Sequence, residues 1–189
     1  MIKCKEDYKR FLTSDKAALG VKHRFPVPLI DDIWIFERCL RKTEYYKNCR
    51  HDFLGKIVYV FLRVRLYRLS LRMGYSIPLN VFAEGLSIAH RGTIIVNGNA
   101  LIGKNCRIQD GVTIGATNGS MDAPQIGNNV FIGSGAKIIG DIRIADDVAI
   151  GAQALVVKSV LEGGITVGGI PAKKISNHDS HSNLLGDLI

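Results

Sequence analysis

The chain has 189 residues, 47% of them hydrophobic, and a formal net charge of +8. This composition is enough for a packed core and excludes wholesale disorder. No apolar run reaches eighteen residues, and the start MIKCKEDYKR lacks the apolar stretch of a secretory signal. We therefore expect a cytoplasmic protein without a membrane span. The four cysteines form no CxxC pair, which favours free thiols over a disulfide or zinc framework.

The charge divides the chain into two regions. Residues 1–76 contain 17 Lys and Arg against 8 Asp and Glu, whereas residues 77–189 contain 8 against 9. The basicity therefore belongs to the N-terminal part alone. We expect a helical region over 1–75, a repeat region over 76–175 and a C-terminal tail over 176–189.

The N-terminal region reads as helical. Asp31 or Asp32 can cap a helix that runs through Trp34, and a second helix is expected from Phe53 to Met73. Four arginines lie beyond the apolar start of this second helix: Arg63, Arg65, Arg68 and Arg72. They favour a solvated or subunit-facing surface, with an anionic membrane surface or an anionic glycan as the alternative. No nucleic-acid-binding motif accompanies the charge, so nucleic acid is not an expected partner.

From about Ser76 the pattern changes to a six-residue repeat. Its aliphatic positions, with one gap of twelve, are Ile102, Ile108, Ile114, Ile126, Ile132, Ile138, Ile144, Ile150 and Val156. A small or aliphatic residue stands two positions before most of them, and Cys106 in such a position is expected to be buried packing rather than a reactive thiol. A six-residue period fits neither a continuous helix nor simple strand alternation, but it fits a short strand and a turn, repeated.

Three such units close a triangular coil whose aliphatic residues point inward and whose backbone bonds to the next coil. A β-sandwich with chance spacing is the weaker alternative. Glycine follows five of the aliphatic positions and is expected to adopt positive φ at the corners: Gly103, Gly115, Gly127, Gly133 and Gly151.

The repeat is interrupted at two places. The step from Ile88 to Val96 is eight residues rather than six, and His90 lies inside it. Residues 116–125 lose the pattern and are expected to bulge outward as a loop. Interruptions of a regular scaffold are where binding chemistry tends to be placed.

The stretch from Gly74 to Ile175 resembles the hexapeptide-repeat acyltransferases, in particular the serine acetyltransferase-like branch, which includes O-acetyltransferases of surface polysaccharides. The matching segments are SIAHRGTIIVN (87–97), GVTIGATNG (111–119), IGNNVFIGSGAKIIGDIRI (126–144) and GGIPAKKI (168–175). The resemblance implies a mainly β fold, a left-handed parallel β-helix after the helical region. It also implies a homotrimer with an active site at each cleft between neighbours, and acetyl-CoA as co-substrate without a metal.

The resemblance also implies roles for individual residues. His90 corresponds to the catalytic histidine, which would remove the proton of the acceptor hydroxyl. Small residues would line the pantetheine arm, and lysines would meet the CoA phosphates. The implied cofactor-binding residues are Ala116, Thr117, Ser134, Ala152, Lys158, Pro171, Lys173 and Lys174. The alternatives are a structural role for His90 and ordinary solvated side chains for the lysines.

Departures from the branch bear on the acceptor. Serine acetyltransferases carry Asp where this chain has Ala89 and Tyr75, and Arg-His-Pro where it has residues 122–124 (Asp-Ala-Pro). Glu84, Asp110 or a backbone carbonyl could orient His90 instead. These departures favour a sugar hydroxyl of a surface polysaccharide or its precursor as acceptor, with L-serine as the alternative.

Other classes remain open at this point. A β-helix metal hydrolase would need three converging histidines, and the repeat region offers only His90. The tail histidines His178 and His181 lie in a polar segment after the repeats. A sugar nucleotidyltransferase would need a Gly-rich nucleotide-binding domain ahead of the repeats. A non-catalytic scaffold that keeps the repeat is the third alternative.

Overall fold

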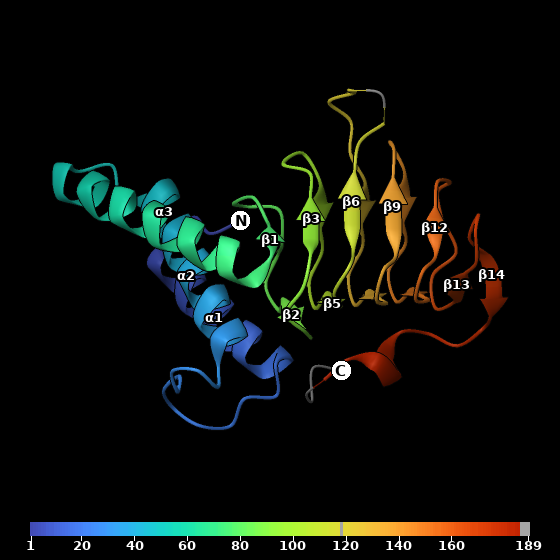
Figure 1. Ribbon diagram of the computed structural model, residues 1–189, viewed down its shortest axis with the longest axis horizontal. Coiled ribbons are helices and arrows are strands. Elements are labelled where there is room, and N and C mark those ends of the chain that lie inside the picture. Colours follow the sequence, from blue (N-terminus) through green and yellow to red (C-terminus); the bar gives the residue numbers. More distant parts are fainter. Residues whose placement is uncertain (118, 186–189) are drawn as a thin grey trace.

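The structure is a computed structural model that describes residues 1–117 and 119–185. In this part of the chain three α-helices come first and short β-strands follow (Figure 1). The helices are α1 (Lys5–Ala18), α2 (Asp32–Cys49) and α3 (Phe53–Met73). None of these described helices is long and apolar enough to cross a bilayer. Residue 118 of the predicted loop and residues 186–189 of the predicted tail lie outside the described residues.

The helix ends follow from local sequence. Asp52 caps α3, because its Oδ2 accepts a hydrogen bond from the backbone N of Gly55 at 3.1 Å. Gly74 ends the same helix with a φ of 79°, a conformation that glycine adopts without steric cost. Asp31 stands at the predicted start of α2, but its carboxylate accepts from the backbone N of Val27 instead of capping the helix.

The strands form three sheets that are the faces of a coiled prism. Sheet A has the order β1 (Tyr75–Ser76), β3 (Ile94–Val96), β6 (Thr113–Gly115), β9 (Lys137–Ile139), β12 (Leu155–Val156). Sheet B has the order β10 (Arg143–Ile144), β7 (Gln125–Ile126), β4 (Leu101–Ile102). Sheet C has the order β14 (Lys173–Ser176), β13 (Thr166–Gly168), β11 (Ala149–Ile150), β8 (Phe131–Ile132), β5 (Arg107–Ile108), β2 (Ser87–Ile88).

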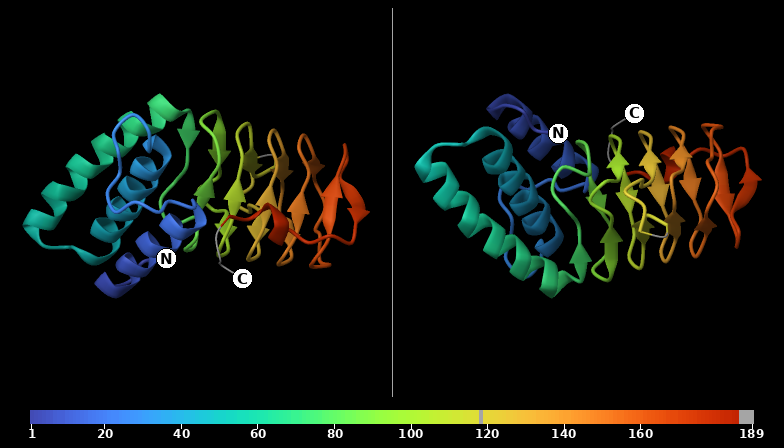
Figure 2. Two further views of the ribbon diagram at one scale, coloured as in Figure 1. Left: turned by 90° about the horizontal axis from the view of Figure 1, so that it is seen from below. Right: turned by 90° about the horizontal axis from the view of Figure 1, so that it is seen from above.

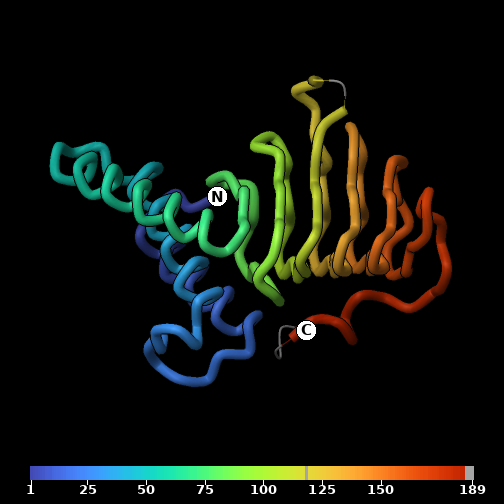
Figure 3. The backbone as a smooth tube through the Cα atoms, in the orientation of Figure 1, coloured from blue at the N-terminus to red at the C-terminus, as the bar shows by residue number. Residues whose placement is uncertain are grey.

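The chain visits the sheets in the order C, A, B, and the coil can be followed in Figure 3. The three middle coils contribute one strand to each face, whereas Phe82 and Val160 extend sheet B by isolated bridges. All strand pairs of the described chain are parallel except β13 with β14. We name the three edges of the prism after the sheets they join: the C–A edge, the A–B edge and the B–C edge. The segment between β6 and β7 projects outward from the A–B edge, where the sequence predicts a loop (Figure 1).

The predicted six-residue stack is the core of the prism. Ile108, Ile114, Ile132, Ile138 and Ile150 have no exposed surface, and the other predicted members are at most 5% exposed. Neighbouring members are paired across parallel strands, for example Ile108 with Ile132. Cys106 is buried beside them, and burial raises the pKa of its thiol to about 12, which makes it unreactive as predicted.

The five repeat glycines do not adopt the positive φ that the sequence predicts. Gly103, Gly127 and Gly133 are needed instead because adjacent coils approach closely: a Cβ on Gly103 would lie 2.5 Å from the backbone O of Gly127. At Gly115 and Gly151 an added Cβ would make only an ordinary contact, at 3.4 Å. Positive φ occurs at other turn residues, including Asn105, Asn129 and Asp147 along the B–C edge. Their side chains form a ladder, with Asn105 donating to Asn129 at 2.9 Å and Asn129 donating to Asp147 at 2.8 Å.

One buried arginine joins the helices to the first coil. Arg41 of α2 donates to Asp15 of α1, to Glu44 and to the carbonyls of Phe82 and Ala83. A single hydrophobic core also runs from the helices into the prism. The helices gather at one end of the prism in both views of Figure 2. The division at residues 75 and 175 into separate domains stays a prediction.

The tail returns along sheet C toward the helices (Figures 1 and 3). Ser180 is fully buried, its backbone N donates to Asp147 O at 3.2 Å, and its hydroxyl donates to Asn129 O. A short 3₁₀ turn (His181–Asn183) follows, and His181 Nε2 lies 2.8 Å from Asp147 Oδ1. The tail is therefore packed against the B–C edge.

Candidate functional site

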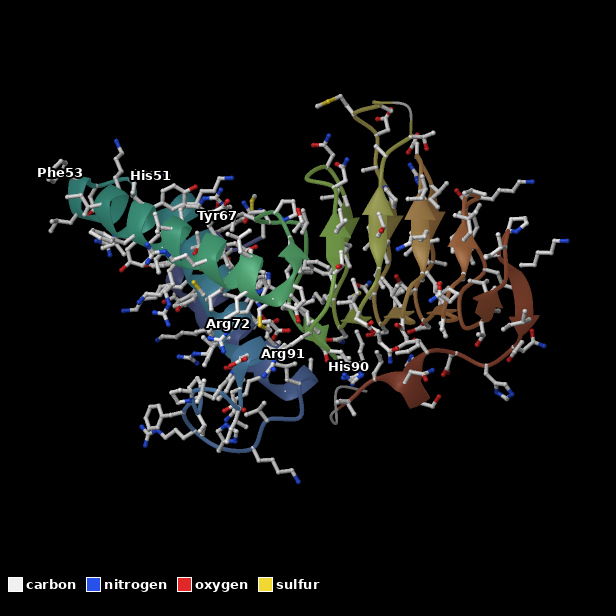
Figure 4. The ribbon with its side chains drawn as sticks, in the orientation of Figure 1. His51, Phe53, Tyr67, Arg72, His90 and Arg91 are labelled. Carbon is white, nitrogen blue, oxygen red and sulfur yellow. The ribbon has the colours of Figure 1, made fainter. Side chains whose placement is uncertain are left out.

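His90 lies on the C–A edge, directly after β2. Strand β2 pairs with β5 so that Ile88 points into the core, and two residues later the chain reaches the edge with His90 exposed (Figure 4). The phenol of Tyr75 donates to the backbone O of His90 at 2.9 Å. Among residues 1–117 and 119–185 the imidazole itself has no hydrogen-bond partner, so it is free to meet a substrate.

Strand register places a column of residues along this edge below His90. Ile88 pairs with Ile108, Ile108 with Ile132, and Ile132 with Ile150. The residues two positions later, His90, Asp110, Ser134 and Ala152, all lie on the C–A edge. The eight-residue step brings Gly92 against Asp110, because a Cβ added to Gly92 would lie 2.9 Å from the Cβ of Asp110. The Asp110 side chain therefore lies one coil from the turn that carries His90, since paired strands are about 4.8 Å apart.

Asp110 is held in place by its other neighbour in the column. The hydroxyl of Ser134 donates to Asp110 Oδ1 at 2.8 Å. Ser134, which was predicted to line a pantetheine arm, lies on the same edge as His90, and its hydroxyl is engaged by Asp110. Ala152 is exposed and small, so no large side chain covers the C–A edge at this coil.

Three of the predicted cofactor residues lie on a different edge. Ile114 pairs with Ile138 and Ile138 pairs with Val156, so Ala116, Gly140 and Lys158 follow one another in a column on the A–B edge. Thr117 follows Ala116 at the base of the projecting loop, and both Thr117 and Lys158 are exposed. Within one chain these residues are separated from His90 by the whole width of sheet A.

The remaining predicted residues lie at the far end of the prism. Pro171 and Lys173 are exposed in the turn that leads into β14 and at its start, and Lys174 pairs with Glu162. The backbone N of Ala172 donates to Leu155 O at 2.7 Å, which ties this turn to sheet A. These positions are distant from His90 along the prism axis, since the intervening coils separate them.

Of the acids proposed to assist His90, the structure favours Asp110 over Glu84. Glu84 lies on the B–C edge, where it accepts from Arg10 at 2.7 Å and pairs with Lys104 at 3.0 Å. Tyr75 is buried edge-on against Phe36. Burial, with a smaller effect from the charge of Glu37, raises the pKa of Tyr75, so its phenol stays a hydrogen-bond donor to His90.

The start of helix α2 lies beside the turn that carries His90, a neighbour that the sequence did not predict. A cavity of about 220 Å³ opens beside Ala89, and its lining includes Asp32, Trp34, Arg91 and Arg107. Asp32 and Arg91 form an ion pair at 2.9 Å, which ties the start of α2 to the residue after His90. The two residues are nearly sixty positions apart in the sequence, so no local motif predicts this ion pair.

Glu37 of α2 is a buried acid above the first coil. Its Oε1 accepts from the backbone N of Ile88 at 3.0 Å, whereas Oε2 has no partner among the described residues. Burial and the nearby charge of Asp15 raise the pKa of Glu37. Glu37 thus satisfies the free edge of β2, two residues before His90.

No group of three or more His, Cys, Asp or Glu side chains that could hold a metal ion occurs in the described part of the chain. The tail histidines are used differently. His181 pairs with Asp147, and the backbone O of His178 accepts from the Thr166 hydroxyl.

The comparisons with known proteins agree with this architecture. The profile of the family "Bacterial transferase hexapeptide (six repeats)" matches residues 123–158. A serine acetyltransferase from Synechococcus elongatus is 37% identical over 94 residues, which cover 49% of this chain and 38% of that protein. The chain spans about half the length of the curated relatives it matches.

Two solved structures extend the likeness to most of the chain. The Neisseria gonorrhoeae serine acetyltransferase in complex with serine has a TM-score of 0.66 and 26% identity, covering 90% of this chain and 68% of that one. The Brucella abortus serine acetyltransferase in complex with coenzyme A has a TM-score of 0.65 and 24% identity, covering 92% and 70%. The predicted left-handed parallel β-helix with an N-terminal helical region, of the hexapeptide-repeat type, is confirmed.

Proposed function

We propose that this hexapeptide-repeat protein, a relative of the serine acetyltransferases, transfers the acetyl group of acetyl-CoA to a hydroxyl group. The observation that carries the proposal is the position of His90. Its imidazole is exposed at a break in the repeat, on the C–A edge that also carries Asp110, Ser134 and Ala152. The relatives' names support the reaction, and a coenzyme A complex of a structural neighbour supports the co-substrate.

His90 performs the proton transfers of the reaction. Its neutral imidazole removes the proton of the acceptor hydroxyl as that oxygen attacks the thioester carbonyl carbon. The resulting oxyanion collapses, the C–S bond breaks, and the imidazolium returns its proton to the departing thiolate. A carboxylate on the same edge stabilises the imidazolium that forms during the attack, and we assign this role to Asp110.

The division of residues between two edges supports a homotrimer. His90, Ser134 and Ala152 lie on the C–A edge, whereas Ala116, Thr117 and Lys158 lie on the A–B edge. A cleft in which the C–A edge of one protomer faces the A–B edge of the next would unite both sets. In that arrangement the exposed Lys158, Lys173 and Lys174 are available to the CoA phosphates, and Pro171 shapes the turn before Lys173.

L-serine is the acceptor that the comparisons support best. The curated relatives are named serine acetyltransferases, and one structural neighbour was solved with serine bound. This reverses the preference for a sugar hydroxyl that the sequence alone suggested. A sugar hydroxyl remains the second candidate because Ala89 and Tyr75 stand where the serine-specific branch carries Asp, and neither can hold an ammonium group.

The test measures CoA thiol release with acetyl-CoA and either L-serine or a panel of free and glycosidically linked sugars. We expect His90→Ala to lower kcat/KM by about 10²–10⁴ while CoA binding measured by calorimetry is unchanged. His178→Ala, an exposed histidine of the tail, is the matched control and should keep full activity. Turnover that survives in His90→Ala would contradict the mechanism, and the acceptor that is consumed identifies the substrate class.

A further inference from the structure

Helix α3 has two apolar faces, and only one is packed. Leu62 and Leu66 are 7% and 4% exposed and face the other helices, whereas Phe61 and Leu71 are 73% and 66% exposed. The exposed apolar side chains are Phe53, Leu54, Ile57, Val60, Phe61, Val64, Tyr67 and Leu71. At 3.6 residues per turn most of them fall on one stripe opposite the packed face. We call this stripe the outer face of α3.

The outer face is bordered by positive charge alone. The sequence of α3 holds five cations and no acidic residue: Lys56, Arg63, Arg65, Arg68 and Arg72. By the helical repeat, Lys56 and Arg63 border one side of the outer face, and the other three border the opposite side. In the described chain only Arg72 of these five has an ion-pair partner, Asp32 at 3.5 Å.

The geometry points to an anionic phospholipid surface as the partner of the outer face of α3. A helix that exposes aromatic and aliphatic side chains between two rows of basic ones lies in the interface of a bilayer, with the apolar stripe inserted and the cations at the headgroups. Helix α3 reaches the end of the molecule away from the β-helix, with Phe53 at its tip, so a flat surface can approach it (Figures 1 and 4).

The same charges disfavour a second copy on this face. A symmetric pair of α3 helices would bring basic borders against basic borders, and the helix offers no acid to compensate them. An anionic bilayer has the complementary sign. The loop between α1 and α2 adds exposed apolar residues at the same helical end of the molecule: Phe25, Val27, Leu29 and Ile30.

The experiment is sedimentation of the full chain with phosphatidylcholine vesicles prepared with and without phosphatidylglycerol. We expect binding to the anionic vesicles only, weakened by added salt because the attraction is screened. Arg63→Gln should weaken binding about fivefold, the effect of one basic residue near an anionic surface. Val64→Asp should weaken it more, since it places an acid in the centre of the stripe.

Leu161→Asp is the matched control, because Leu161 is 75% exposed on the far part of the prism and lies off α3. It should bind vesicles as the unmodified protein does. Circular dichroism and light scattering of each variant check the fold and the particle mass. Absence of binding to anionic vesicles, equal binding to both vesicle types, or a lower particle mass in Val64→Asp would each overturn the proposal; the last would assign the face to a second copy. The outcome is independent of the acetyl transfer.

Discussion

The helical region and the β-helix are stabilised in different ways. In the β-helix each coil contacts mainly its neighbours, and one aliphatic position per strand builds a continuous core. In the helical region the contacts are long-range and include buried charges, with Arg41 joining α1, α2 and the first coil. The packing of a repeat can therefore be predicted from the spacing of its apolar residues, whereas the contacts at a junction between two regions cannot.

The largest expected effect breaks the junction. Arg41→Met leaves the carboxylates of Asp15 and Glu44 buried without their cation, and we expect a loss of about 3–5 kcal/mol in the free energy of unfolding. Urea unfolding followed by circular dichroism measures it. Arg10→Met is the control, because Arg10 is 53% exposed where it pairs with Glu84, and its loss should be much smaller. Equal losses in both variants would mean that the burial of the Arg41 cluster does not stabilise the junction.

A second prediction concerns the edge of the β-helix. Asp110→Asn removes the charge one coil below His90, and we expect kcat/KM to fall about tenfold, well short of the effect of removing the imidazole. The carboxylate stabilises the positive charge that the imidazole acquires during the proton transfer, so its removal slows that step. Asp146→Asn on the B–C edge is the control and should leave kcat/KM unchanged. An unchanged kcat/KM in Asp110→Asn as well would make Asp110 a structural residue.

The smallest expected effect concerns Glu37, where the two regions meet. Its pKa is raised by burial and by Asp15, so the folded protein retains a proton that the unfolded chain releases above pH 4.5. The stability from this group is therefore complete at low pH and is lost as pH rises toward the folded pKa. Glu37→Gln keeps an acceptor for Ile88 N without titrating. Each 1 kcal/mol that Glu37→Gln adds to the free energy of unfolding raises Tm by about 2–4 °C.

The measurement is the Tm of both proteins between pH 5 and pH 8. The advantage of Glu37→Gln over the unmodified protein should grow as pH rises. Glu162→Gln, an exposed carboxylate, should show no such trend. An advantage that shrinks with rising pH would mean that Glu37 is ionised and stabilised in the folded state.

The sequence by itself determined the β-helix and the place of His90. The six-residue period identifies the inward residues because every coil repeats one local geometry, and the eight-residue step that contains His90 stands out against it. Helix α3 was predicted with its observed bounds for a similar reason, since its apolar stripe and its capping residues are local. The glycine prediction failed because a close approach between coils cannot be distinguished from a positive φ by sequence alone.

Only the tertiary structure decided which side chains meet. It separated Glu84 from the edge that carries His90 and placed Asp110 and Ser134 there, because register depends on the stacking of whole coils. It brought Asp32 and Glu37 of α2 to the first coil and assembled the Arg41 cluster. These contacts join segments far apart in the chain, and their energy comes from burial and charge that no local pattern encodes.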